Sequence, residues 1–222
     1  MELMHKLDYN SLKQRHRAER HGYHPNLNLR VHRSLSWLQC AELQKDLDSR
    51  FIFLWIAFNA AYATEIDESL KLSERSSFCS FLEKLSSLDQ ENLLEELIWK
   101  EFPNSIRILL SNKFVFQPFW DFQNGKISES EWIDQFENAK FSAQTALGAG
   151  NTSVVLSIVL VRTYTLRNQI VHGGSTWRSS VNREQVKDCA ALLGKLLPIT
   201  ISIMMSSKNT IWGDPCYPVI SY

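Results

Sequence analysis

Hydrophobic residues recur at intervals of three and four along most of this chain, which is the spacing of one face of an α-helix. No stretch shows the strong polar–apolar alternation of a half-buried strand. The spacing predicts helices over residues 9–20, 30–46, 49–64, 74–88, 89–101, 104–113, 128–147, 153–172 and 181–205. We therefore expect an all-α fold, an antiparallel helical bundle.

The helix predicted over residues 49–64 is apolar on nearly every side, which indicates a central and buried position. Asn59 lies in this helix, and a buried amide needs hydrogen-bond partners. Two interpretations are open. Either Asn59 is satisfied within the core, or it points toward the polar residues near 167–172 and contributes to substrate binding.

Two segments interrupt the helical spacing. Residues 114–125 hold an aromatic cluster made of Phe114, Phe116, Phe119, Trp120 and Phe122. Pro118 disfavours a continuous helix there. Such a cluster either stacks unpaired bases or covers a helical core, and we favour the second interpretation. Residues 148–151 form a break before the next helix. The bundle is thus expected to contain an inserted helical and aromatic middle segment.

The formal net charge of the 222 residues is zero, so no overall field favours a nucleic-acid partner. Residues 1–33 differ, because seven Lys and Arg against three Asp and Glu leave a charge of +4. This basic N-terminal arm either contacts RNA phosphates or is a flexible terminus. We expect a helical domain over residues 34–206 to follow it, and an irregular C-terminal tail over residues 207–222.

The hydrophobic content of 44% and charged content of 22% are typical of a soluble globular protein. The four cysteines form no Cys-x-x-Cys pair and no zinc-spaced group with histidine, so we expect free thiols and neither a metal nor another cofactor. The N-terminus lacks the apolar core of a signal peptide. The longest apolar runs, near residues 51–63 and 154–161, are too short to span a bilayer. We therefore expect a cytoplasmic protein with no membrane partner.

The candidate chemistry lies in a run that reads LRNQIVHGG and closes the helix predicted over residues 153–172. Thr152 or Ser153 is suited to cap the start of this helix. Gly173 or Gly174 is suited to end it with a residue in the left-handed conformation.

His172 is then in the last turn, where unpaired carbonyls and the helix dipole favour a protonated imidazole that acts as acid or base. Asn168 shares its face and is suited to orient the ring. Arg167 lies about 140° around the helix and is suited to bind phosphate. Because one helix cannot easily aim both side chains at one small substrate, the spacing favours a homodimer with two facing copies. Arg178, in the following loop, is a candidate for a further phosphate contact.

The sequence Arg-Asn-x-x-x-His-Gly near the end of a late helix resembles the HEPN superfamily, in particular its Apea-like branch. The family motif is an Arg, four to six residues, and a His, often with a polar residue directly after the Arg. Arg167, Asn168 and His172 match it position by position. The aromatic segment 51–62 is similar to an early helix of that branch, and the family architecture would cover roughly residues 34–206.

This resemblance implies a metal-independent endoribonuclease with a composite Arg/His site at a homodimer interface. In such an enzyme the ribose 2′-hydroxyl attacks its own phosphate and leaves a 2′,3′-cyclic phosphate. The implied settings are phage defence, toxin–antitoxin pairs and stress response, with RNA and an antitoxin or defence-system protein as partners.

Relatives without the motif imply an alternative, a non-catalytic helical module that binds RNA or a partner protein. A third possibility is a toxin silenced by nucleotidylation. The family pattern for that control has Tyr two residues after the His, where this chain has Gly174.

The spacing alone is not specific. Two other pairs near the N-terminus satisfy it, Arg15 with His21 and Arg17 with His24. They lie in a polar stretch without an apolar stripe, so we interpret them as chance. The apolar helix before the motif and the glycines after it distinguish Arg167 and His172. A surface arginine and a capping histidine that merely stabilise a helix end remain the structural alternative.

Overall fold

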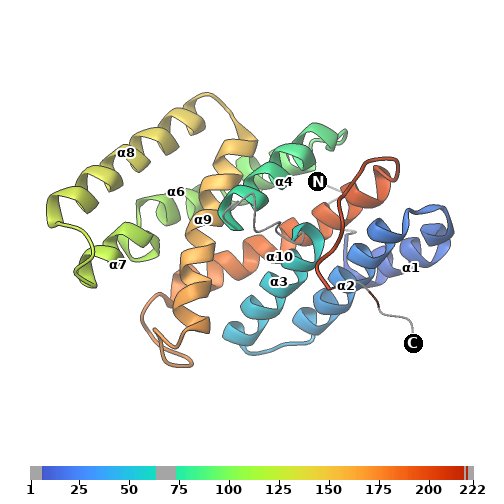
Figure 1. Ribbon diagram of the computed structural model, residues 1–222, viewed down its shortest axis with the longest axis horizontal. Coiled ribbons are helices and arrows are strands. Elements are labelled where there is room, and N and C mark those ends of the chain that lie inside the picture. The colour runs from blue at the N-terminus through green and yellow to red at the C-terminus, as the bar shows by residue number, and fades with distance from the viewer. Residues whose placement is uncertain (1–6, 64–73, 218, 220–222) are drawn as a thin grey trace. The chain divides into compact units, whose positions relative to one another are not determined.

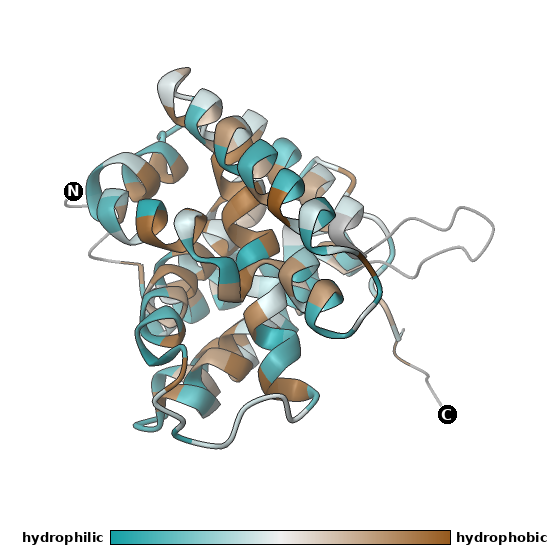
Figure 2. Cartoon of the chain, turned by 90° about the vertical axis from the view of Figure 1, so that its left-hand side faces the viewer, coloured by the Kyte–Doolittle hydropathy of each residue, from teal (hydrophilic) through white to brown (hydrophobic). Residues whose placement is uncertain are grey.

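The structure, a computed structural model, describes residues 7–63, 74–217 and 219. It confirms the all-α prediction. Figure 1 shows the arrangement of the helices, and in Figure 2 most of them carry both hydrophobic and hydrophilic residues. The elements are α1 (Tyr9–Glu19), η2 (Arg20–Gly22), α2 (Pro25–Glu42), α3 (Leu47–Tyr62), α4 (Glu74–Leu88), α5 (Leu93–Glu96), η3 (Leu97–Glu101), α6 (Pro103–Ser111), η4 (Lys113–Val115), α7 (Gln117–Gln123), α8 (Glu129–Gly148), α9 (Thr152–Val171) and α10 (Arg183–Ser206).

These elements form two compact units. The first unit consists of Met1–Leu94 and Ala190–Tyr222, and the second of Glu95–Cys189. The second unit is therefore inserted in the sequence of the first. Helix α10 begins in the second unit and continues in the first. An inserted middle was expected, but as a segment that ends before the motif helix. The insertion includes α9, so Arg167, Asn168 and His172 all belong to it.

The start of α2 differs from the prediction of residue 30, because the helix begins at Pro25. The His24 side chain accepts a hydrogen bond from the backbone N–H of Asn26 at 3.2 Å and so caps the first turn. Proline fits this turn because its missing N–H is not needed there. The expected boundary between arm and domain, after residue 33, consequently lies inside α2.

Arg30 shows why this part of the expected arm is folded. Its side chain is completely buried, and Nη1 donates to the carbonyl oxygens of Ala61 at 2.9 Å and Ala63 at 2.8 Å. Nη2 donates to the carbonyl oxygen of Asp214 at 3.0 Å. The guanidinium thus satisfies carbonyls at the end of α3 and also holds the C-terminal tail. It is not available to an RNA phosphate.

Other arginines of the expected arm are also bound within the first unit. Arg33 donates to the carbonyl oxygens of Cys216 at 2.7 Å and Tyr217 at 2.5 Å. Arg15 donates to the Glu19 carboxylate at 2.9 Å. Residues 1–6 of the arm lie outside the described residues. Most of the expected arm is therefore part of a helical unit.

Helix α3 is the buried centre of the first unit, as its apolar composition predicts. Phe51, Trp55 and Phe58 are at most 1% exposed. Helix α2 packs along it, and Ser34 Oγ donates to the carbonyl oxygen of Ala57 at 2.9 Å between the two helices. The burial of these large rings supplies much of the hydrophobic stabilisation of this unit.

In the second unit, α9 packs against both α6 and α8. The aromatic cluster of residues 114–122 contacts α8, with the Phe119 and Trp132 rings 5.2 Å apart and the Phe116 and Phe136 rings also 5.2 Å apart. Pro118 does not prevent a helix, because it lies in the first turn of α7. The cluster covers a helical core, which agrees with the interpretation that we favoured over base stacking.

A buried cation lies against this cluster. The Arg162 side chain is 2% exposed, and its Cζ lies 4.1 Å from the centre of the Phe116 ring. A guanidinium over an aromatic face is stabilised by the ring quadrupole. Arg162 therefore belongs to the packing of α9 and not to its surface.

All four cysteines are free thiols, as expected. Cys189 is buried, and burial raises the pKa of its thiol to about 12. The apolar run at residues 154–161 is part of α9, a helix of 20 residues, which is the length predicted from the sequence. Helices α9 and α10 have the length and composition of a membrane span, although 72% of the apolar window in α10 is buried within the protein. A buried core helix of a soluble protein has the same properties.

Candidate functional site

The candidate site begins with the way in which α9 ends. The backbone N–H of Gly173 donates to the Ile170 carbonyl at 3.2 Å, and that of Gly174 donates to the Gln169 carbonyl at 2.7 Å. Gly173 has φ +72°, the left-handed conformation that glycine adopts without strain. This pair of bonds is the Schellman motif, and it confirms that a glycine ends the helix. At the other end the cap is Asn151 instead of the expected Thr152 or Ser153.

His172 is the C-cap residue of α9, and its side chain is exposed. Its backbone N–H donates to the Asn168 carbonyl at 3.0 Å, so the main chain stays helical up to this residue. The imidazole consequently lies at the carbonyl end of the helix. The position agrees with the prediction from the sequence.

Arg167 is half-buried on the flank of α9. Its Nη1 donates to Oδ1 of Asn168 at 2.9 Å, and its Cζ lies 6.0 Å from the centre of the Tyr164 ring. Asn168 was expected to orient the imidazole of His172. Its amide oxygen instead accepts the hydrogen bond from Arg167, so it orients the guanidinium.

The loop after His172 is closed by Gln169. Its side-chain Nε2 donates to the Phe114 carbonyl at 2.6 Å, and its Oε1 accepts from Asn182 Nδ2 at 3.0 Å. Its own carbonyl accepts from Gly174. One residue thus joins both ends of the loop to η4. The sequence did not indicate this role, because Phe114 and Asn182 lie far from Gln169 along the chain.

Arg178 lies in this loop and is exposed, as expected for a substrate-binding candidate. Its Cζ lies 4.2 Å from the centre of the Trp177 ring, so the guanidinium stacks on the indole. Trp177, to which the sequence pattern assigned no role, is 68% exposed.

Asn59 lies on α3, in the first unit, whereas Arg167 and His172 lie in the second. Its Oδ1 is buried and has no hydrogen-bond partner among the described residues. The prediction that Asn59 takes part in the site therefore stays a prediction.

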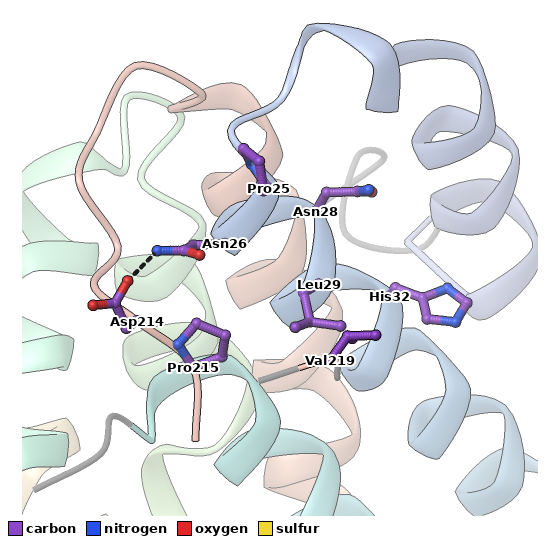
Figure 3. A pocket seen from close by; sticks show the side chains of 8 residues that line it. All are labelled: Pro25, Asn26, Asn28, Leu29, His32, Asp214, Pro215 and Val219. Atoms are coloured by element: carbon purple, nitrogen blue, oxygen red, sulfur yellow. Dashed lines mark hydrogen bonds between the residues drawn. The ribbon is translucent and has the colours of Figure 1, made fainter. Parts of the chain in front are cut away.

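The first unit contains a cavity of about 590 Å³, lined by residues of α2 and of the C-terminal tail. In Figure 3, Asn26 Nδ2 donates to Asp214 Oδ1 at 2.6 Å on one side of this cavity, and His32 lies on the other side. Among residues 7–63, 74–217 and 219, no three His, Cys, Asp or Glu side chains are grouped closely enough to hold a metal ion. The candidate site is thus an exposed helix end with an adjoining loop.

Comparison with protein-family models, with curated proteins and with solved structures finds no match to this chain.

Proposed function

We propose that this protein is a metal-independent endoribonuclease of the HEPN type, whose site is built at the C-terminal end of α9. The observation that carries the proposal is an exposed imidazole at a capped helix end, five residues after a guanidinium held on the helix flank. His172 supplies an imidazole that can give and accept a proton, and Arg167 supplies a permanent positive charge. Cleavage of an RNA phosphodiester requires a proton transfer and stabilisation of negative charge on the phosphate, and these two groups supply them.

The proposed reaction uses the RNA's own 2′-hydroxyl as the nucleophile. The 2′ oxygen forms a bond to phosphorus, the bond from phosphorus to the 5′ oxygen breaks, and the proton passes from the 2′ oxygen to the leaving 5′ oxygen. His172 moves this proton. Arg167 stabilises the charge that develops on the phosphate oxygens, and Asn168 holds Arg167 in place. The products are a 2′,3′-cyclic phosphate and a 5′-hydroxyl.

The proposed active form is a homodimer. The Cα positions of Arg167 and His172 are about 140° apart around α9, and in the proposed dimer the guanidinium of one copy meets the imidazole of the other. Val171 is 49% exposed and Val181 is 63% exposed, on either side of the loop after His172. In the proposed dimer the second copy covers these two side chains. RNA is the substrate, and an antitoxin or defence-system protein is the proposed regulator.

The test is digestion of a mixed-sequence RNA with purified protein in the presence of EDTA, with the product ends identified by mass spectrometry. We expect cyclic phosphate ends, and a rate about 10²–10⁴-fold lower for His172→Ala because a general acid–base group is lost. Arg167→Ala is expected to be similarly inactive, with an unchanged circular dichroism spectrum. The matched control is His21→Ala, which removes the exposed histidine of a chance Arg–His pair.

Two results would refute the nuclease proposal. One is equal cleavage by the wild type and by both α9 variants, which would indicate a contaminating nuclease. The other is RNA binding without any cleavage product, which would indicate the non-catalytic binding module.

A further inference from the structure

The loop between α9 and α10, at the lower left of Figure 1, contains a tight turn. The backbone N–H of Ser179 donates to the Thr176 carbonyl at 3.0 Å, so Trp177 and Arg178 are the two central residues of a four-residue turn. We call Thr176–Ser179 the turn tip.

Arg178 occupies a position in the turn tip that normally favours glycine. Its φ is +57°, in the left-handed region, and a positive φ at the third position is a property of type II turns. A side chain with a Cβ is strained there, whereas glycine is not. Strained residues of this kind concentrate at functional sites, where the side chain has a use. The strained backbone therefore makes the Arg178 side chain a candidate for a functional contact.

The position of the turn tip is fixed by hydrogen bonds at both ends of its loop. Gln169 accepts from Gly174 at one end and from Asn182 at the other, and it also donates to Phe114. The same residue lies one turn before His172. The turn tip is thus held on the framework that carries the proposed catalytic histidine.

The turn tip has the chemistry of a nucleotide-binding surface. The Trp177 indole is 68% exposed although the Arg178 guanidinium stacks on it at 4.2 Å. Stacking orients the guanidinium and leaves much of the indole surface accessible. An unpaired base binds to such a ring through its π-face, and its phosphate binds to a nearby arginine.

We propose that the turn tip binds a nucleotide of single-stranded RNA, with Trp177 stacking on an unpaired base and Arg178 binding the adjoining phosphate. This inference rests on the proposed function for the identity of the ligand. It adds that the substrate must be single-stranded at the site, because a base within a duplex is already stacked between its neighbours.

The test measures binding and not cleavage, so that it is separate from the nuclease test. In the His172→Ala background, a fluorescently labelled single-stranded RNA of mixed sequence is titrated with Trp177→Ala, Trp177→Phe and Arg178→Gly. We expect Trp177→Ala to weaken binding about ten- to hundred-fold, and Trp177→Phe to retain most of the affinity. The control is Phe141→Ala, which removes another highly exposed ring from the same unit and should leave binding unchanged.

Arg178→Gly separates binding from stability. Glycine relieves the strained φ, so the melting temperature should stay the same or rise. RNA binding should nevertheless weaken, and the slope of log K against log salt should fall by about one, since one phosphate contact is lost. A loss of binding together with a loss of stability would contradict the proposed role of the side chain.

Two further probes identify the ligand. The same RNA paired with its complement, and a single strand of the same length with abasic nucleotides, should bind equally well to the parent and to Trp177→Ala. The proposal is overturned if Trp177→Ala binds the single strand as tightly as the parent does. It is also overturned if Trp177→Ala loses as much affinity for the abasic strand as for the strand with bases. Conversion of Trp177→Ala to monomers, measured by mass in solution, would also overturn the proposal and assign the indole to a subunit contact.

Discussion

Nη1 of Arg167 donates a hydrogen bond to Oδ1 of Asn168 at 2.9 Å. Consecutive residues on a helix do not face each other, so the arginine side chain must curve around α9 toward Asn168 to make this bond. The bond fixes a flexible side chain on the helix flank, near the Tyr164 ring. A fixed guanidinium stabilises developing charge better than a mobile one, because its orientation is set before the reaction.

Asn168 should therefore act as a positioning residue in the proposed nuclease. We expect Asn168→Ala to lower kcat about ten- to hundred-fold with little change in KM, because Arg167 is no longer held in place. Asn168→Asp keeps an acceptor for the guanidinium and should restore most of the rate. Steady-state kinetics on a defined RNA measure both. If Asp and Ala are equally impaired, Asn168 has another role.

Gln169→Met should loosen the loop that carries Trp177. The variant loses one hydrogen bond to Phe114 and one to Asn182, a cost of about 1–3 kcal/mol in the free energy of unfolding. Trypsin should then cut faster after Arg178 and Arg183, which the fragment masses identify. Gln169→Glu, which retains the acceptor for Asn182, should be cut at an intermediate rate. Equal cutting of the wild type and Gln169→Met would show that the loop is held by other contacts.

His16 should make the first unit sensitive to acid. Its ring is buried, Nε2 bonds to Asn28 Oδ1 at 2.7 Å, and Nδ1 has no hydrogen-bond partner among the described residues. Burial lowers its pKa below 6.5, and Lys13, His32 and Arg20 lower it further, although Asn28 opposes the shift. Because the unfolded chain binds a proton more readily than the folded one, stability is complete above pH 6.5 and is lost as the pH falls below it.

Urea unfolding at several pH values measures this effect. His16→Gln keeps a polar group of similar size, and its stability should depend less on pH below 6.5. His32 contributes a residual dependence, because burial lowers its pKa and Lys13, Arg20 and Arg33 lower it further. Equal pH dependence in the wild type and His16→Gln would exclude His16 as the source.

Arg30→Met should destabilise the first unit by at least about 2 kcal/mol, since buried carbonyls lose charged donors. Burial lowers the pKa of Arg30 to about 10, while Cys216 and Asp214 oppose the shift, so the side chain stays charged at neutral pH. Arg33→Met is the comparison, because its carbonyl partners lie in the more exposed tail, and it should cost less. Chemical denaturation gives both values. A change below about 0.5 kcal/mol in Arg30→Met would mean that water replaces the guanidinium.

Local signals in the sequence predicted the local structure. The glycines after His172 predicted the end of α9, because a left-handed residue is needed there. The helix predicted over residues 128–147 is α8, and Ser128 and Glu131 form the reciprocal capping box at its start. The predicted start of α2 at residue 30 is wrong, because Pro25 fits the first turn of a helix and α2 begins there.

Contacts between distant segments were not predictable in this way. Arg30 was counted among the cations of a basic arm, but its acceptors are carbonyls near residues 61–63 and 213–214 that carry no signal in their side chains. Gln169 was overlooked for the same reason, because a backbone carbonyl of Phe114 is one of its partners. The division into two units depends on such contacts as well.

The most direct test of the central claim, a site shared between two copies of α9, is the RNA cleavage rate of mixed subunits. Arg167→Ala and His172→Ala are each expected to be inactive, but a dimer of one with the other has one intact pair of Arg167 and His172. When an equal mixture is unfolded and refolded together, half of the dimers are mixed, and each mixed dimer has one intact site of two. The mixture should therefore regain about a quarter of the wild-type rate. A mixture no more active than either variant alone would contradict a composite site.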